Sequence, residues 1–376
     1  MSKLDELIAE LCPDGVEYVR LAECCDIEDN KRKPVKSSLR IPGDTPYYGA
    51  NNIQDYVEGY THYGQYVLIA EDGSASLENY SVQYVDGFFW ANNHVHVIKG
   101  RKDLDTKFLY YYLTSFNFIP FLTGGTRAKL NKGNMEEIPI PLPPLPVQQE
   151  IVRILDNFTE LTAELTAELT ARRKQYEYYR DLLLTFDDDV PRLAISDLLI
   201  RTKGTNITAQ KMRQLHKENG EVRIFAGGKT YADVDFKDIP KKDINLNPSI
   251  IVKSRGIIEF EYYDKPFSHK NEFWSYYSEN KNVNIKFVYY YLSKNVNYFQ
   301  RIANNMQMPQ ISIPVTDKYK VPLPPIKEQE RIVAILDRFD ALCNDLTSGI
   351  PAEIEARQKQ YEYYRDKLLS FKEVTS

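Results

Sequence analysis

The chain has 376 residues, of which 43% are hydrophobic and 27% charged, and its formal net charge is −5. A chain of this length is expected to form two or three domains, and its composition is that of a soluble globular protein, so disorder is not the default. Net acidity argues against a nucleic-acid partner only if the bases are evenly spread, because phosphates are bound by local Lys and Arg. They are not: residues 120–135 hold three bases and no acid, and residues 199–229 hold seven bases and two acids.

The first 11 residues mix apolar and charged positions at helical spacing, which predicts a short amphipathic helix and not a secretory signal. No apolar run in the sequence is long enough to cross a membrane. The four cysteines form neither a CxxC pair nor a regular framework, so we expect no disulfides and a cytoplasmic location.

Residues 12–140 contain short β-rich runs, such as Tyr66 to Ala70, between turns rich in Gly, Asn and Asp. This pattern predicts a module of mixed strands and helices. His94 and His96 alternate along one expected strand, but no further Cys or His cluster accompanies them. We therefore expect these two histidines to be structural or to face a nucleic acid, and not to bind a metal.

A long helix is expected after Pro141-Leu142-Pro143-Pro144, because proline cannot continue a strand and is favoured in the first turn of a helix. No Gly or Pro occurs between Val147 and Phe186, and about 40 residues of helix extend over roughly 60 Å. The middle of this stretch repeats the unit Thr-Ala-Glu-Leu at 162–165 and 166–169. Since four residues make about one turn, adding a unit lengthens the helix with little rotation.

The second half of the chain repeats the first. Pro322-Leu323-Pro324-Pro325 lies 181 residues after the first proline-rich segment, and Lys359 to Asp366 is identical to Lys174 to Asp181. Upstream, Lys107 to Leu113 recurs as Lys286 to Leu292 with one substitution. A run of eight identical residues at corresponding places indicates an internal duplication.

The second module shows the same pattern, with strands expected at Ser249 to Lys253 and Gly256 to Phe260. Its segment Ala226 to Thr230 ends like a phosphate-binding loop, but Arg223 occupies the place of the required first glycine, so we expect no nucleotide site. The second long helix is interrupted at Ser348-Gly349-Ile350-Pro351, where the repeat spacing grows from 181 to 185 residues. Heptad spacing at the shared ends predicts that the two long helices pack on each other.

Two mixed modules, each followed by a proline-rich start of a long helix, resemble the specificity subunits of type I restriction-modification enzymes. The shared motif is Ile138-Pro139-Ile140-Pro141-Leu142-Pro143-Pro144 with Gln148, and Tyr319-Lys320-Val321-Pro322-Leu323-Pro324-Pro325 with Gln329. The resemblance covers essentially the full length, and the order of parts and the Thr-Ala-Glu-Leu tandem make it specific. The second copy departs from a straight, symmetric rod by its four extra residues and its Gly349/Pro351 break.

The resemblance implies an α+β fold with two target-recognition domains, separated by two long antiparallel helices of coiled-coil type and related by a pseudo-two-fold axis. With the boundaries above, the recognition domains are residues 1–140 and 190–321, and the conserved helical regions are residues 141–189 and 322–376. The implied function is recognition of a bipartite, asymmetric site in double-stranded DNA.

The implied partners are two methyltransferase subunits, which methylate adenine, and restriction subunits, which cleave DNA. S-adenosylmethionine, ATP and Mg²⁺ are expected on these partners. The chain itself is expected to be non-catalytic and to hold no cofactor or metal. Two other functions remain open: a stand-alone duplicated DNA-binding regulator, and a helical scaffold that binds no nucleic acid.

Loop Lys and Arg favour phosphates, whereas Asn, Gln and Arg beside glycine reach base edges. The candidate DNA-binding residues of the first module are Asn51, Asn52, Arg127, Lys129, Asn131 and Lys132. Those of the second module are Lys229, Lys253, Arg255, Lys270, Gln307 and Gln310. For each of them, a solvated surface or turn residue is the alternative explanation.

Candidate contacts between the long helices, or with a partner subunit, are Phe158, Leu165, Tyr176, Tyr179, Phe339, Tyr361 and Tyr364. The four tyrosines belong to the identical segments 174–181 and 359–366, which repeat although the modules around them diverge. An ordinary coiled-coil core is the alternative explanation for each of these residues.

Overall fold

The computed structural model describes residues 3–125, 128–304, 309–345 and 347–374. The chain divides into two compact units: Met1–Thr166 with Glu353–Ser376, called the first unit below, and Ala167–Ala352, called the second unit. The divisions fall inside two long helices, α5 (Leu145–Leu183) and α12 (Ile350–Leu368).

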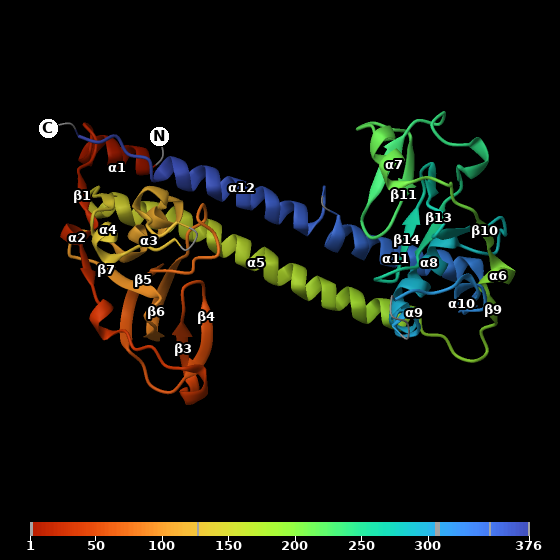
Figure 1. Ribbon diagram of the computed structural model, residues 1–376, viewed down its shortest axis with the longest axis horizontal. Helices are drawn as coiled ribbons and strands as arrows, with labels where there is room; N and C mark the ends of the chain where they lie inside the picture. The colour runs from red at the N-terminus through yellow and green to blue at the C-terminus, as the bar shows by residue number, and fades with distance from the viewer. Residues whose placement is uncertain (1–2, 126–127, 305–308, 346, 375–376) are drawn as a thin grey trace. The chain divides into compact units, whose positions relative to one another are not determined.

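The first unit is built on a six-stranded sheet of order β2-β7-β5-β6-β3-β4 (Figure 1). Its central strand β5 is antiparallel to β6 and β7, and residues 67–70 of β5 are completely buried. Helix α3 packs against β5 and β6. The elements are α1 (Lys3–Leu11), β1 (Tyr18–Arg20), α2 (Leu21–Cys24), β2 (Cys25–Ile27), β3 (Pro42–Tyr48), β4 (Ile53–Val57), β5 (His62–Ala70), β6 (Val82–Ala91), β7 (Val95–Gly100), α3 (Thr106–Ser115), α4 (Lys132–Glu136) and β8 (Pro139–Pro141).

Both ends of the chain belong to the first unit (Figure 1). The Val16 N–H donates to the Lys372 carbonyl over 2.8 Å, and the Val374 N–H donates to Val16 over 3.1 Å. Leu4 and Leu369 are buried in the same apolar core. The C-terminal segment is therefore part of the core of the N-terminal unit.

The second unit contains a four-stranded sheet of order β10-β16-β13-β14 and a three-stranded sheet of order β12-β11-β15. Its main core joins the four-stranded sheet to α8 and to the start of α11. The elements are β9 (Arg192–Ala194), α6 (Ile195–Leu198), β10 (Ile200–Thr202), α7 (Ala209–Leu215), β11 (Val222–Phe225), β12 (Tyr231–Val234), β13 (Ser249–Lys253), β14 (Glu259–Tyr263), β15 (Phe267–His269), β16 (Trp274–Tyr277), α8 (Ile285–Lys294), α9 (Val296–Ala303), α10 (Ile313–Asp317), β17 (Lys320–Pro322) and α11 (Ile326–Asn344).

The two units share one frame, which confirms the duplication. Strands β2-β7-β5-β6 of the first unit have the same order and antiparallel pairing as β10-β16-β13-β14 of the second. The short pair β1–β8 corresponds to β9–β17. The frames differ in the segment after their first strand: β3 and β4 lie between β2 and β5, whereas α7, β11 and β12 lie between β10 and β13.

The same polar contacts hold each long helix to its module. The Lys107 ammonium is 2.8 Å from the Asp156 carboxylate, and the Tyr111 hydroxyl donates to it over 2.6 Å. Lys286 and Tyr290 make the same contacts with Asp337, at 2.8 and 2.5 Å. Burial and the hydrogen bond to the carboxylate raise the pKa of both tyrosines. The repeated Lys-Phe-x-Tyr-Tyr-Tyr-Leu motif thus docks α3 and α8 onto the long helices.

Some boundaries differ from the expectation. The strand expected at Gly256 to Phe260 is placed three residues too early: Gly256 has φ +73° and lies in a turn, and β14 runs from Glu259 to Tyr263. His94 precedes β7 and does not alternate with His96 along it. The break in the second long helix is confirmed between Asn344 and Ile350, where the Asp345 carboxylate accepts from the Thr347 and Ser348 backbone. Hydrogen bonds from the Ser348 and Thr347 hydroxyls, together with these backbone bonds, lower the pKa of Asp345.

The four cysteines are free thiols and all are buried. Within the described residues, no helix has the length and apolar character that crossing a membrane requires.

Candidate nucleic-acid interface

Four loops of the first unit are joined by hydrogen bonds around the end of β5. The Asn51 side chain donates to the Gly73 carbonyl and accepts from the Ala75 N–H, both over 2.8 Å. The Glu71 N–H donates to His94, and the Leu130 N–H donates to Glu71. The loops at 49–53, 71–76, 92–94 and 128–131 therefore form one surface, which we call the loop cluster of the first unit.

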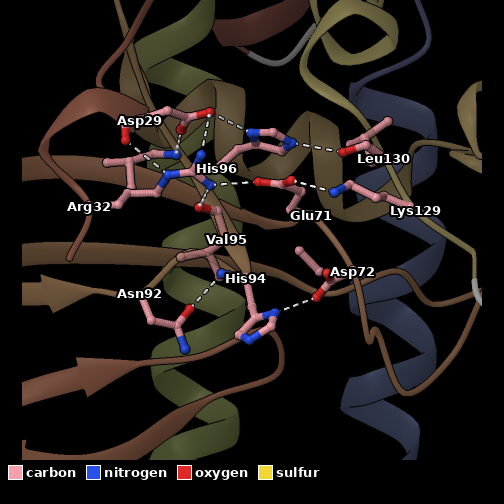
Figure 2. A network of polar contacts seen from close by, with 12 residues as sticks. Asp29, Arg32, Glu71, Asp72, Asn92, His94, Val95, His96, Lys129 and Leu130 are labelled. Carbon is pink, nitrogen blue, oxygen red and sulfur yellow. Dashed lines mark hydrogen bonds and ion pairs between the residues drawn. The ribbon is translucent and has the colours of Figure 1, made fainter. Parts of the chain in front are cut away.

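A buried polar network supports this loop cluster (Figure 2). The His96 ring, 1% exposed, lies between the Asp29 carboxylate at 2.6 Å and the Leu130 carbonyl at 2.8 Å. Arg32 donates over 2.8 Å to Glu71, whose other carboxylate oxygen is 2.8 Å from the Lys129 ammonium. Burial raises the pKa of Glu71, but the hydrogen bonds from Lys129 and Arg32 outweigh burial and lower it.

The structure brings together the described candidates of the first module and also gives them structural partners. Asn51 joins two loops, and the Asn52 side chain accepts from the neighbouring Ile53 N–H. Asn131 caps helix α4 by accepting from the Asn134 N–H over 2.9 Å. Lys132 is 3.7 Å from Glu136 and stays more than half exposed. Arg127 lies outside the described residues.

The corresponding loops of the second unit meet in the same way. The Ile311 N–H donates to Ser254, the Gly256 N–H donates to Pro309, and Ser254 Oγ donates to Glu272 over 2.8 Å. Residues Arg255 and Gln310 are bridge partners there, as Asp72 and Lys129 are in the first unit. Equivalent places in the two loop clusters thus carry different side chains.

The cations of this second loop cluster are mostly paired. Lys253 is 7% exposed, and its ammonium lies 2.7 Å from Glu261 and 2.9 Å from Glu259. Burial lowers the pKa of Lys253, but these two hydrogen bonds outweigh burial and raise it. A buried, doubly paired cation lacks the free charge that a phosphate contact requires, so a structural role explains Lys253 better. Lys270 is paired with Glu272 at 2.7 Å, whereas Arg255 is exposed.

Two further candidates of the second module remain. Lys229 is exposed in the turn between β11 and β12. Gln307 lies outside the described residues.

Sequence reasoning missed one basic segment of the first unit. Residues 30–43 contain five bases and no acid, and the criterion that selected residues 120–135 would have found them. Arg32 and Arg40 are held by carboxylates, but the side chains of Lys33 and Lys36 are exposed and have no polar partner among the described residues. The Lys33 backbone is bonded to Ala91 and to the Trp90 indole, next to the loop cluster.

The aromatic candidates on the long helices make equivalent contacts in the two units. Phe158 of α5 stacks on Tyr364 of α12 with ring centroids 5.4 Å apart. Phe339 of α11 stacks on Tyr179 of α5 at 5.7 Å and contacts Tyr176 at 6.2 Å. The predicted pairing of the long helices is therefore present in each unit.

The candidates on the long helices differ in how deeply they are buried. Tyr361 packs at the edge of the first core, and Leu165 is half-buried. Tyr179 and Tyr364 remain 37% and 41% exposed, so they are less buried than core residues would be.

No group of three or more Cys, His, Asp or Glu side chains that could hold a metal ion occurs among the described residues. The exposed His94 ring has one partner, the Asp72 carboxylate at 2.5 Å (Figure 2).

Known proteins resemble this chain along almost its whole length. The family described as "Type I restriction modification DNA specificity domain" matches residues 13–172 and 193–356. A Haemophilus influenzae protein described as a type I restriction enzyme specificity subunit is 45% identical over 95% of this chain and 96% of its own. The specificity subunit of the EcoR124I/EcoR124II type I restriction enzyme of Escherichia coli is 34% identical over 70% of each chain.

The fold is also found among solved structures. The S subunit of a type I restriction-modification system from M. genitalium matches with a TM-score of 0.65 at 17% identity. The match covers 94% of this chain and 96% of that subunit.

Proposed function

Because the chain belongs to the type I restriction-modification DNA specificity family, we propose that its two units each recognise one half of a bipartite, asymmetric DNA site. Recognition of DNA sequence within a restriction-modification complex is the function of this family, and its members are non-catalytic recognition subunits. Neither a stand-alone regulator nor a scaffold without nucleic acid is supported. The four free cysteines fit a cytoplasmic complex.

One observation carries this proposal: the two units share a frame but differ in the segment inserted after its first strand. β3 and β4 fill this place in the first unit, and α7, β11 and β12 fill it in the second. A duplicated frame presents two recognition surfaces related by pseudo-symmetry, as a bipartite site requires. Because the inserted segments differ, the two half-sites differ in sequence.

The partners are two methyltransferase subunits, together with restriction subunits in a cleaving complex. S-adenosylmethionine belongs to the methyltransferase subunits, and ATP and Mg²⁺ belong to the cleaving partners. The identical segments 174–181 and 359–366 suit two identical partners, one at each copy. Each segment contains two adjacent tyrosines. The first of each pair, Tyr178 and Tyr363, are 65% and 62% exposed and therefore add little to the core of this chain.

Replacing Tyr178 and Tyr363 by Ala is expected to weaken assembly with the methyltransferase subunits and to leave the melting temperature of the chain unchanged. Truncating an aromatic anchor in an interface costs about 2 kcal/mol or more, whereas a surface substitution stays within about 0.5 kcal/mol. Titration of the methyltransferase subunit measures the first effect. The control replaces Tyr56 and Tyr298, which are 53% and 43% exposed outside the repeated segments. Unchanged assembly of the first variant would contradict the partner assignment.

The proposed division of labour is tested by methyl transfer from labelled S-adenosylmethionine to duplex DNA. The chain alone is expected to transfer nothing above a control without enzyme, because the family supplies recognition and not catalysis. The chain combined with an adenine methyltransferase subunit is expected to methylate specific sites. Transfer by the chain alone, or site-specific transfer by the methyltransferase without the chain, would overturn the proposal.

A further inference from the structure

The inserted segment of the second unit, residues 203–248, contains most of the basic stretch 199–229. Three of the seven bases in this stretch are paired. Arg201 is 2.5 Å from Asp317, Arg223 is 2.7 Å from Asp233, and Lys217 is 3.1 Å from Asp238. The side chains of the other four make no hydrogen bond or ion pair with any residue that the structure describes: Lys203, Lys211, Arg213 and Lys229.

One of these four cations, Arg213, lines a pocket, and two others, Lys211 and Lys229, lie on the elements that form it. Arg213 lines it together with Met212, and both belong to α7, as does Lys211. Ala226 and Thr230 also line the pocket and flank the turn that carries Lys229. The Ala226 N–H donates to Thr230, and Gly228 takes φ +64°, so the turn is tight. We call the surface formed by Lys211, Arg213, Lys229 and this pocket the α7 face.

The α7 face is fixed in position and has no acidic lining. Met212, Ala226 and Ala232 belong to a small apolar core with β11 and β12, which holds the helix against the hairpin. None of the pocket-lining residues is Asp or Glu, and neither α7 nor the turn at 226–230 contains one. Three exposed cations on elements that contain no acid favour a local positive potential on a chain whose net charge is −5.

The pocket also presents groups that suit a nucleic acid. Tyr231 is 49% exposed, and the Arg223 guanidinium lies 4.0 Å above its ring. The His216 Nδ1 accepts from the Asp233 N–H over 3.1 Å, which leaves Nε2 as the donor of the ring. Lys253 and Lys270, two of the four cations of this module first expected to bind DNA, are instead paired with glutamates.

We propose that the α7 face binds the phosphates of duplex DNA at the half-site of the second unit. Arg213 and Lys229 bind phosphates at the pocket, and Lys211, on another side of α7, binds a further phosphate. This inference rests on the proposed function. It adds Lys211 and Arg213 to the candidate Lys229 and places these DNA contacts on the inserted segment, which is where the two copies differ.

The test replaces Lys211, Arg213 and Lys229 by Ala in the assembled complex with methyltransferase subunits. Affinity for a duplex carrying the mapped methylation site is measured across a range of salt concentrations. The slope of log K against log salt should fall by about 0.9 for each lost phosphate contact, or by between two and three in all. The exchange K211R, R213K and K229R keeps the charges and should retain the slope. Lys229→Ala alone should lower it by about one.

The control replaces Lys265, Lys281 and Lys327, three exposed lysines without a polar partner among the described residues, and should leave the slope unchanged. An unchanged slope in the first triple variant, or an equal fall in the control, overturns the assignment. Loss of co-elution with the methyltransferase subunits at an unchanged slope would instead assign the α7 face to a protein partner. A wild-type complex that binds no duplex at low salt would contradict the proposed function itself.

Discussion

Inserting one Thr-Ala-Glu-Leu unit after Leu169 is expected to move the two half-sites apart while leaving both half-site sequences unchanged. The insertion lies inside α5, which is helical from Leu145 to Leu183. One unit lengthens a helix by about 6 Å and rotates it by about 40°. Successive base pairs rise about 3.4 Å, so the gap grows by somewhat less than two base pairs, and compliance in the DNA could reduce this to one.

The repeated unit is suited to such an insertion. The Thr162 and Thr166 hydroxyls each donate to the carbonyl four residues earlier, over 2.9 and 2.8 Å, so an added unit satisfies its own hydroxyl inside the helix. Mapping methylated sites across a genome measures the spacing. An insertion of two residues is the control, because it turns the rest of the helix by about 200° and should abolish methylation. Original spacing with the same half-sites, or altered half-site sequences, would show that α5 does not set the gap.

Replacing Gln148 by Leu is expected to lower the free energy of unfolding of the first unit by about 1–3 kcal/mol or more, because the buried Pro143 carbonyl and two partly buried backbone groups lose their partners. Gln148 is completely buried. Its Nε2 donates to Asp103 and Pro143 over 2.8 and 2.7 Å, and its Oε1 accepts from the Asp105 N–H over 2.8 Å. These bonds join the start of α5 to the loop before α3.

Gln329→Leu should have the same effect on the second unit. Gln329 makes the equivalent bonds, to Asn282 and Pro324 over 2.9 and 2.8 Å and from the Asn284 N–H over 2.9 Å. Urea unfolding followed by fluorescence separates the units, because the two tryptophans of the chain, Trp90 and Trp274, lie one in each. The control Gln149→Ala changes an exposed neighbour. Stability equal to wild type for either Leu variant would show that the motif glutamine is dispensable.

The features that local sequence determines were predictable. Proline ends a strand and begins a helix, so the start of α5 could be inferred from the sequence. The duplication could be inferred from the repeated segments. The stacking of Phe158 on Tyr364 and of Phe339 on Tyr179 agrees with the heptad spacing. By contrast, β14 begins three residues later than expected, because the turn at Gly256 sets the pairing register.

The candidate interface depended on contacts between residues far apart in the chain. Lys129 is paired with Glu71, 58 positions away, and Lys253 is buried between two glutamates of the next strand. Composition alone does not reveal which cations have such partners. It identified 199–229 as basic, but only the fold separates the three paired bases of that stretch from the four without a partner.

The central claim, that each unit recognises its own half-site, is tested most directly by the affinity of the assembled complex for four duplexes. These carry the mapped site, the site with its first half scrambled, the site with its second half scrambled, and the site with both scrambled. Each mismatched base pair costs about 1–3 kcal/mol, so scrambling either half should weaken binding by at least about tenfold, and the two losses should add in free energy. If scrambling one half leaves the affinity unchanged, the unit assigned to that half does not recognise DNA sequence, and the account of two recognition units is contradicted.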